Sequence, residues 1–230
     1  MRADGLWIDR GGAWIGPGQD RIYALMTEFG VSSYKQYTDG QSIIVVDGKQ
    51  YRYKGTVPLS MSPWAAVNLG AVMLEITQMC KSIPLDAPWE AKNAQTWDQI
   101  SLAKWLSNHT LSKPAHATLE TAIAGCYTSA ASEVSMLFVV YQMASGGGPG
   151  FVLGGKDASQ DSRPVGGMGA IYRPMTAEIG DALHLSQPVR RIEQDEDGVT
   201  VRSDEMTVRA RRAVVAVPIA IASQSIYEPM

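Results

Sequence analysis

The sequence predicts a mixed fold of the α+β or α/β class, in which a sheet domain carries a mostly helical insertion. Strand patterns occur toward both ends of the chain, and helical patterns fill the middle. The 230 residues are 45% hydrophobic and 19% charged, a composition typical of a globular protein with a sizeable core. No internal repeat is visible, so we expect strands from both ends to belong to one sheet domain.

The N-terminal part combines a glycine-rich loop, a helix and a hairpin. In order, we expect an apolar run at 6–9, the loop at 10–19, a helix at 21–29, and hairpin strands at 42–46 and 50–53. Asp20 is the expected N-cap of the helix, and Gly30 is expected to end it. Asp47-Gly48 is a strong two-residue turn signal between the two strands.

The middle of the chain is helical. In order, we expect a helix from Ser62-Pro63 to about Lys81, a helix from Thr96 or Asp98 through Leu106, one or two buried helices over 115–144, a loop at 145–159, and a helix from 166–169 to about Gly180. Ser62-Pro63 forms a helix-start signal. The periodicity of the first helix is carried by Val67, Ala71, Leu74 and Gln78.

The last fifty residues return to strand patterns. Strands are expected at 189–193, 199–202 and 207–209, around turns at Asp197-Gly198 and Asp204-Glu205. The continuous apolar run at 213–217 stands before Pro218 and is typical of a strand buried on both faces.

Charge and cysteine content exclude several classes of protein. The 20 basic and 23 acidic residues are interspersed and leave a net charge of −3, which argues against a nucleic-acid-binding surface. Cys80 and Cys126 are too few for a disulfide scaffold and fit a reducing compartment. The sequence contains no run of about 18 apolar residues, so we expect no membrane helix. The first residues lack the apolar core of a signal peptide. We therefore expect a cytoplasmic protein with no membrane or nucleic-acid partner.

The glycine clusters are the most informative feature of the composition. Most glycines only end helices and form turns. The segment 150–156 matches the phosphate-binding pattern G-x-x-x-x-G-K, but Asp157 replaces the hydroxyl residue that binds magnesium, so we reject that interpretation. In the loop 10–19, Gly11 and Gly12 leave room for close approach to the backbone, and Trp14 offers a flat apolar face. This combination suits a large planar cofactor that carries phosphate.

A set of motifs, in order along the chain, supports this interpretation. They are Arg10-Gly-Gly-Ala-Trp-Ile-Gly-Pro-Gly-Gln19, Ile83-Pro-Leu-Asp-Ala-Pro-Trp-Glu90, Trp97-Asp98, Ser101-Leu-Ala-Lys-Trp105, Ser132-Glu-Val-Ser135, Gln160-Asp-Ser-Arg163, Gly166-Gly-Met-Gly169 and Ala216-Val-Pro218. Together they resemble the flavin-dependent monoamine oxidases, including the bacterial enzymes similar to putrescine oxidase. The resemblance covers essentially the whole chain.

The resemblance implies an FAD-dependent enzyme that oxidises small amines. In such enzymes the carbon beside the amine loses a hydride equivalent to FAD, water converts the imine to an aldehyde and ammonia, and oxygen is reduced to hydrogen peroxide. The cofactor-binding positions it implies are Gly11, Gly12, Trp14 and Val189. The substrate-cavity positions are Gly125, Cys126, Gln160 and Leu153 or its neighbour Val152. It implies no catalytic acid or base and no metal ligand among these residues.

The resemblance also implies parts that this sequence does not contain. No G-x-G-x-x-G turn, which holds the cofactor pyrophosphate in such enzymes, occurs here. We therefore expect an inactive fragment that alone binds FAD weakly or not at all. A partial FAD-binding domain is expected at 1–40 and 181–230, and a partial substrate domain at 41–180. Exposed apolar surfaces of such a fragment predict a homo-oligomer.

Two alternatives remain open at this stage. A related L-amino-acid or polyamine oxidase shares the broad fold, but it needs a residue that pairs with the substrate's carboxylate or additional amines, and the sequence identifies none. A non-catalytic helical binding module with a hairpin at its flank is the alternative from another class. The flavin content of the purified protein separates the last alternative from the oxidases.

Overall fold

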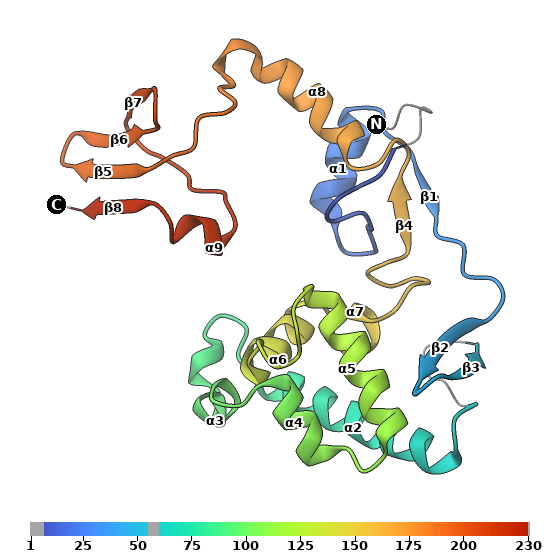
Figure 1. Ribbon diagram of the computed structural model, residues 1–230. Coiled ribbons are helices and arrows are strands. Elements are labelled where there is room, and N and C mark those ends of the chain that lie inside the picture. Colours follow the sequence, from blue (N-terminus) through green and yellow to red (C-terminus); the bar gives the residue numbers. More distant parts are fainter. Residues whose placement is uncertain (1–6, 55–59, 230) are drawn as a thin grey trace. The chain divides into compact units, whose positions relative to one another are not determined.

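The computed structural model describes residues 7–54 and 60–229 and divides the chain into two compact units (Figure 1). The first unit extends to Tyr172, and the second begins at Arg173. Helix α8 (Gly169–Ile179) crosses this boundary. Helices and strands both occur, so the predicted mixed fold is confirmed. Residues 1–6, which include Leu6 of the expected apolar run, lie outside the described residues.

The first unit contains most of the helices and two small antiparallel sheets. Its elements are α1 (Asp20–Glu28), β1 (Ser33–Lys35), β2 (Ser42–Val46), β3 (Lys49–Tyr53), α2 (Pro63–Ser82), the 3-10 helix η1 (Pro88–Glu90), α3 (Ala94–Asp98), α4 (Leu102–His109), α5 (Lys113–Tyr127), α6 (Met136–Ser145), α7 (Pro149–Val152) and β4 (Ser162–Pro164). Strand β1 pairs with β4, and β2 pairs with β3.

The β2–β3 hairpin has the predicted turn. Val46 is opposite Lys49, and Asp47 and Gly48 have φ angles of +51° and +74°. Positive φ at both central residues is the requirement of a type I′ turn, which Asp-Gly satisfies at low cost. The predicted hairpin is therefore confirmed.

Helix α2 begins where Ser62-Pro63 predicts, but its buried face differs from the stripe that predicted the helix. The Ser62 hydroxyl accepts a hydrogen bond from the Ala65 N–H at 3.3 Å. Val67 and Leu74, in the predicted stripe, are 64% and 61% exposed. The buried positions are Ala65, Asn68, Leu69, Val72, Ile76 and Met79. The helix is apolar on two faces, so periodicity alone did not select the face that packs against α5 and α6.

The helical core of the first unit is formed chiefly by α2, α4, α5 and α6. Its fully buried side chains include Ile76, Leu102, Leu106, Ile123, Met136, Val139, Val140 and Met143. The region 115–144 forms two helices that are separated at Thr128, which has a φ of +50°. The expectation that this whole region is buried is wrong for α5, because only its Ala115, Leu119 and Ile123 are buried. The other residues of α5 are partly or fully exposed to solvent.

Two helix starts and one expected loop differ from the sequence expectation. Asp20 is the first residue of α1 and makes no capping bond, while Gln19 occupies the N-cap position. Thr96 and Asp98 lie within the short helix α3, and α4 begins after Ser101, whose hydroxyl accepts from the Lys104 N–H at 3.2 Å. The expected loop at 145–159 contains the four-residue helix α7. At α1 and α4 the observed start lies within a few residues of the predicted one, whereas α7 was not predicted.

The second unit is built on a four-stranded sheet in the order β7-β6-β5-β8. Its elements are the end of α8, the 3-10 helix η2 (Gly180–Ala182), β5 (Arg191–Asp195), β6 (Gly198–Arg202), β7 (Thr207–Ala210), α9 (Ile219–Ala222) and β8 (Ile226–Pro229). Strands β5, β6 and β7 form an antiparallel meander, and β8 pairs with β5 in parallel. The three predicted strands of the meander are confirmed.

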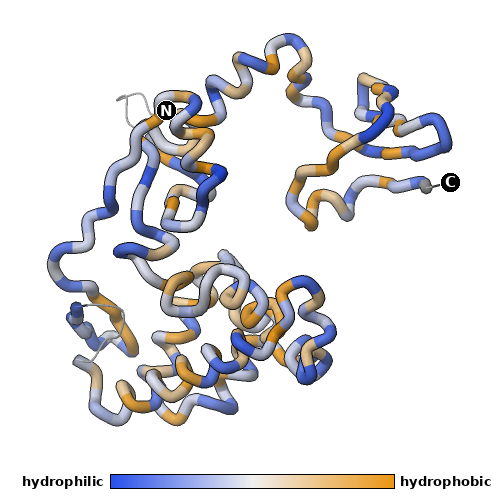
Figure 2. The backbone as a smooth tube through the Cα atoms, turned by 180° about the vertical axis from the view of Figure 1, so that it is seen from behind, coloured by the Kyte–Doolittle hydropathy of each residue, from blue (hydrophilic) through white to orange (hydrophobic). Residues whose placement is uncertain are grey.

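The prediction of a buried strand at 213–217 is wrong. This segment forms no strand, and Val214 is 91% exposed. Figure 2 shows the hydrophobic residues that lead from this segment into α9. A strand needs a hydrogen-bonding partner, and among the described residues the position parallel to β5 is taken by β8.

Candidate functional site

The glycine-rich loop 10–19 presents an open surface. Ala13 and Ile15 are buried, whereas Trp14 between them is 46% exposed. A Cβ atom added at Gly11 or Gly12 would meet no atom within 4 Å. Backbone and indole here are therefore accessible to a flat group, which is the geometry expected of a cofactor-contact loop.

The far side of this loop is fixed to the segment 158–162. Ile15 and Ser162 exchange two backbone hydrogen bonds, each of 2.9 Å. A Cβ atom on Gly16 would lie 2.2 Å from the carbonyl oxygen of Ala158, so only glycine fits this close approach. The loop that carries Trp14 is thus held against the segment that carries Gln160.

Asp9 supplies a second attachment before the loop. Its carboxylate accepts from Arg163 Nη2 at 3.1 Å and from the Met168 N–H at 3.0 Å. A Cβ atom on Gly167 would lie 2.6 Å from Asp9 Oδ1, and Gly167 has a φ of +71°. The glycines of the 166–169 motif therefore permit close packing of Asp9 before α8 begins.

A cavity of about 760 Å³ lies in the first unit. The residues after β1, the β2–β3 hairpin, α2, α5 and the segment 150–158 line it. The lining is Gln36, Thr38, Gly40, Ser42, Ile43, Ile44, Tyr53, Lys54, Leu69, Met73, Thr118, Leu119, Thr121, Ala122, Gly150, Leu153, Gly154, Gly155, Lys156 and Ala158. This volume suits a small organic molecule, and the lining combines apolar side chains with a few polar groups.

The four predicted substrate-cavity residues do not all line this cavity. Leu153 does. Gly125 and Cys126 follow Ala122 on α5 but lie outside the lining and are exposed. Gln160 is half-buried, and its N–H donates to the carbonyl of Gly154, a lining residue, at 3.3 Å. Partial desolvation raises the pKa of the Cys126 thiol, so this thiol is protonated at neutral pH.

Asp161 is a functional candidate that the sequence did not single out. It is 3% exposed, and its carboxylate accepts from Lys35 Nζ at 2.5 Å, Ser162 Oγ at 2.6 Å and the Asp157 N–H at 2.8 Å. The bond from Lys35 is the main cause that lowers the pKa of Asp161 to about 2. The available signal was an acidic residue within the Gln160-Asp-Ser-Arg163 motif, but its partner Lys35 is 126 positions away.

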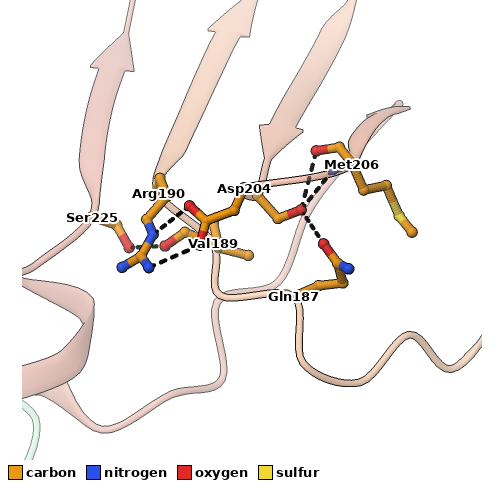
Figure 3. A network of polar contacts seen from close by, with 7 residues as sticks. Gln187, Val189, Arg190, Asp204, Met206 and Ser225 are labelled. Atoms are coloured by element: carbon orange, nitrogen blue, oxygen red, sulfur yellow. Dashed lines mark hydrogen bonds and ion pairs between the residues drawn. The ribbon is translucent and has the colours of Figure 1, made fainter.

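Val189 belongs to the second unit, in a segment held by polar contacts (Figure 3). Its carbonyl accepts from Ser225 Oγ at 3.1 Å, and its side chain is partly exposed. The next residue, Arg190, makes two bonds of 2.9 and 3.0 Å to the carboxylate of Asp204. This pairing lowers the pKa of Asp204. The backbone at Val189 is therefore held in place while one side stays accessible.

Two of the three histidines, His109 and His116, have neighbours that account for them structurally. His109 stacks on Trp105 with ring centroids 4.1 Å apart and lies 3.0 Å from Glu75. His116 Nδ1 lies 2.8 Å from Thr110 Oγ1. In the described part of the chain, no three His, Cys, Asp or Glu residues are grouped as a metal site. None of the helices described combines the length and apolarity needed to cross a membrane.

Comparison with known proteins decides the family. The family model described as flavin containing amine oxidoreductase matches residues 1–229. The chain belongs to this family. The resemblance found in the sequence motifs is therefore confirmed.

Similar amine oxidoreductases are known from several organisms. Putrescine oxidase of Kocuria rosea is 33% identical over 241 residues, which covers 98% of this chain and 50% of that protein. The flavin-containing amine oxidase of Danio rerio is 30% identical, covering 92% and 41%. A solved triple mutant of putrescine oxidase gives a TM-score of 0.88 at 29% identity, covering 99% and 51%. This chain spans about half the length of these relatives.

Proposed function

We propose that this chain supplies the cofactor-contact loop and part of the substrate cavity of an FAD-dependent amine oxidase. The observation that carries the proposal is the attachment of the loop 10–19 to the segment 158–162. Two backbone hydrogen bonds between Ile15 and Ser162 and the close approach of Gly16 to Ala158 join the two segments. A cofactor loop must adjoin the substrate cavity, because hydride transfer requires the reacting atoms within about 3–3.5 Å.

The described residues fit FAD where the family pattern places it. Gly11 and Gly12 leave space at the backbone, and Trp14 is an exposed aromatic face on the same loop. Val189 offers a fixed backbone for the adenine end. Bound FAD would accept a hydride equivalent from the carbon beside the amine and pass electrons to oxygen. Since the sequence has no G-x-G-x-x-G turn, we infer that this chain alone holds FAD weakly and is inactive.

The chain's own contribution to the reaction is to bind and orient the amine. Leu69, Met73, Leu119 and Leu153 give the cavity an apolar wall, which favours the neutral amine because burial disfavours its charged form. The neutral amine is the form that can be oxidised. We keep Gly125, Cys126 and Gln160 as proposed substrate-contact residues. We also keep residues 1–40 and 181–230 as the proposed partial FAD-binding domain and residues 41–180 as the proposed partial substrate domain.

We propose a primary monoamine as the substrate. Among the described lining residues the charged ones are Lys54 and Lys156, and no carboxylate is present to pair with a second ammonium group. The same two lysines favour a substrate that carries a carboxylate, so an L-amino-acid oxidase is the second candidate. The rates of hydrogen peroxide production with benzylamine, putrescine and L-leucine as substrates rank these candidates directly.

Flavin content tests the proposal. The protein expressed with its complete reading frame should show flavin absorption at roughly 375 and 450 nm, which is a property of the cofactor. Amine addition without oxygen should bleach these bands. A protein with neither the bands nor amine-dependent peroxide release would instead support the non-catalytic binding module.

A substitution tests the proposed substrate position. In the complete protein, Gly125→Leu should disfavour bulky amines relative to small ones by about 1–3 kcal/mol. A Cβ atom at Gly125 meets nothing within 4 Å, so the first atom of the new side chain fits without displacing a neighbour. An unchanged ranking of amine substrates would remove Gly125 from the site.

A further inference from the structure

The walls of the cavity come from segments that are far apart in the sequence. One wall is the stretch directly after β1, with Gln36, Thr38 and Gly40. Another is the segment 150–158, which carries Leu153. The pairing of β1 with β4, which places Lys35 opposite Ser162, brings the two walls together. Contacts beside this ladder then determine how the segment 150–158 lies against the stretch after β1.

The carboxylate of Asp161 bonds to both walls. Lys35, whose Nζ lies 2.5 Å from Asp161 Oδ2, is the residue directly before Gln36. The Asp157 N–H, which donates to Asp161 Oδ1 at 2.8 Å, lies between the lining residues Lys156 and Ala158. The backbone adds a third link, since the Gln36 N–H donates to the Asp161 carbonyl at 2.8 Å.

The burial of the Asp161 carboxylate favours a lasting contact with Lys35. Asp161 is 3% exposed, so loss of Lys35 would leave a buried carboxylate without its only cationic partner within 4 Å among the described residues. Removing the cationic partner of a buried carboxylate is unfavourable, because it leaves a buried charge uncompensated. Lys35 itself is 70% exposed, so its replacement removes the pair without opening a hole in the core.

We propose that Lys35 and Asp161 are positioning residues that hold the two cavity walls at one spacing and thereby place Leu153 and Gln160. Neither residue belongs to the cavity lining. The proposal rests on the proposed function to the extent that the cavity takes an amine. It adds a residue pair that sets the shape of the amine site from outside it.

Amide hydrogen exchange tests whether the pair holds the wall. The variants are Lys35→Met and Asp161→Asn, with Lys35→Arg as the conservative rescue. Glu75→Gln is the matched control, because it removes a carboxylate that pairs with His109 at 3.0 Å outside the cavity lining. Exchange at the amides of Asp157, Ser159 and Gln160 should become at least about tenfold faster in the first two variants, since a hydrogen bond to a charged group is lost. It should stay near the original rate in Lys35→Arg and Glu75→Gln.

Amine binding tests the consequence for the site. Benzylamine is titrated into the complete protein and its variants, and the dissociation constant is followed by NMR. Lys35→Met should weaken binding by about tenfold or more, because displaced walls no longer match the ligand, and Lys35→Arg should restore it.

The two experiments separate the two proposals. If the unmodified protein binds no benzylamine but the exchange rates change as expected, the amine function fails and the wall-holding role stands. If the amide exchange rates and the benzylamine affinity of Lys35→Met and Asp161→Asn equal those of the unmodified protein, the positioning role is overturned, whatever the function.

Discussion

Gly16→Ala is expected to destabilise the first unit by detaching the glycine-rich loop. The added Cβ atom would lie 2.2 Å from the Ala158 carbonyl oxygen and 2.9 Å from Ser159 Cα. Ordinary contacts begin at 3.4 Å, so a backbone segment has to move by more than 1 Å. Such a movement strains the paired hydrogen bonds between Ile15 and Ser162.

The expected cost follows from overpacking. Forcing an additional group into a packed site costs about 1–3 kcal/mol. With a urea dependence of roughly 2 kcal/mol per molar for a unit of this size, the unfolding midpoint should fall by roughly 0.5–1.5 M.

Tryptophan fluorescence is a suitable assay, because all six tryptophans lie in the first unit. Gly11→Ala is the matched control in the same loop, since its Cβ atom meets nothing within 4 Å. Its midpoint should be unchanged or slightly higher, because alanine restricts the unfolded chain more than glycine does. Equal midpoints for the two variants would refute the argument that Gly16 is required for close packing.

Two further predictions concern pH and association. The folded pKa of Asp161 is about 2, below its ordinary value of 3.8, so its stabilising effect is complete above pH 4 and is lost as the pH falls from about 4 to 2. Lys35→Met should flatten this acid dependence of the fluorescence midpoint; an unchanged slope would contradict it. We also expect a homo-oligomer, because Val67 and Leu74 on α2 and Val214 expose apolar surface. Light scattering that gives only the 24.9 kDa monomer at high concentration would contradict this.

Local chemistry in the sequence determined several elements without help from the rest of the chain. Asp47-Gly48 predicted the hairpin, because these residues accept positive φ angles at low cost. Ser62-Pro63 predicted the start of α2, because a hydroxyl there caps an N–H three residues later. The ordered set of motifs from Arg10 to Pro218 identified the family, and the match to residues 1–229 confirmed it.

The tertiary structure alone decided which surfaces meet. Helix α2 has apolar residues on two faces, and packing against α5 and α6 buried the face with Val72 and Ile76. The run at 213–217 has the composition of a buried strand but forms none, because pairing depends on a neighbour as well as on composition.

The candidate site shows the same division. The sequence predicted Trp14 and Leu153 as site residues, and the structure places the first in an open loop and the second in a cavity wall. The sequence showed no sign that Lys35 bonds to Asp161, which is 126 positions away. Caps and turns depend on atoms within about four residues, so a sequence displays them directly. A contact between distant residues forms only when the whole unit packs, and for that reason only the folded structure reveals it.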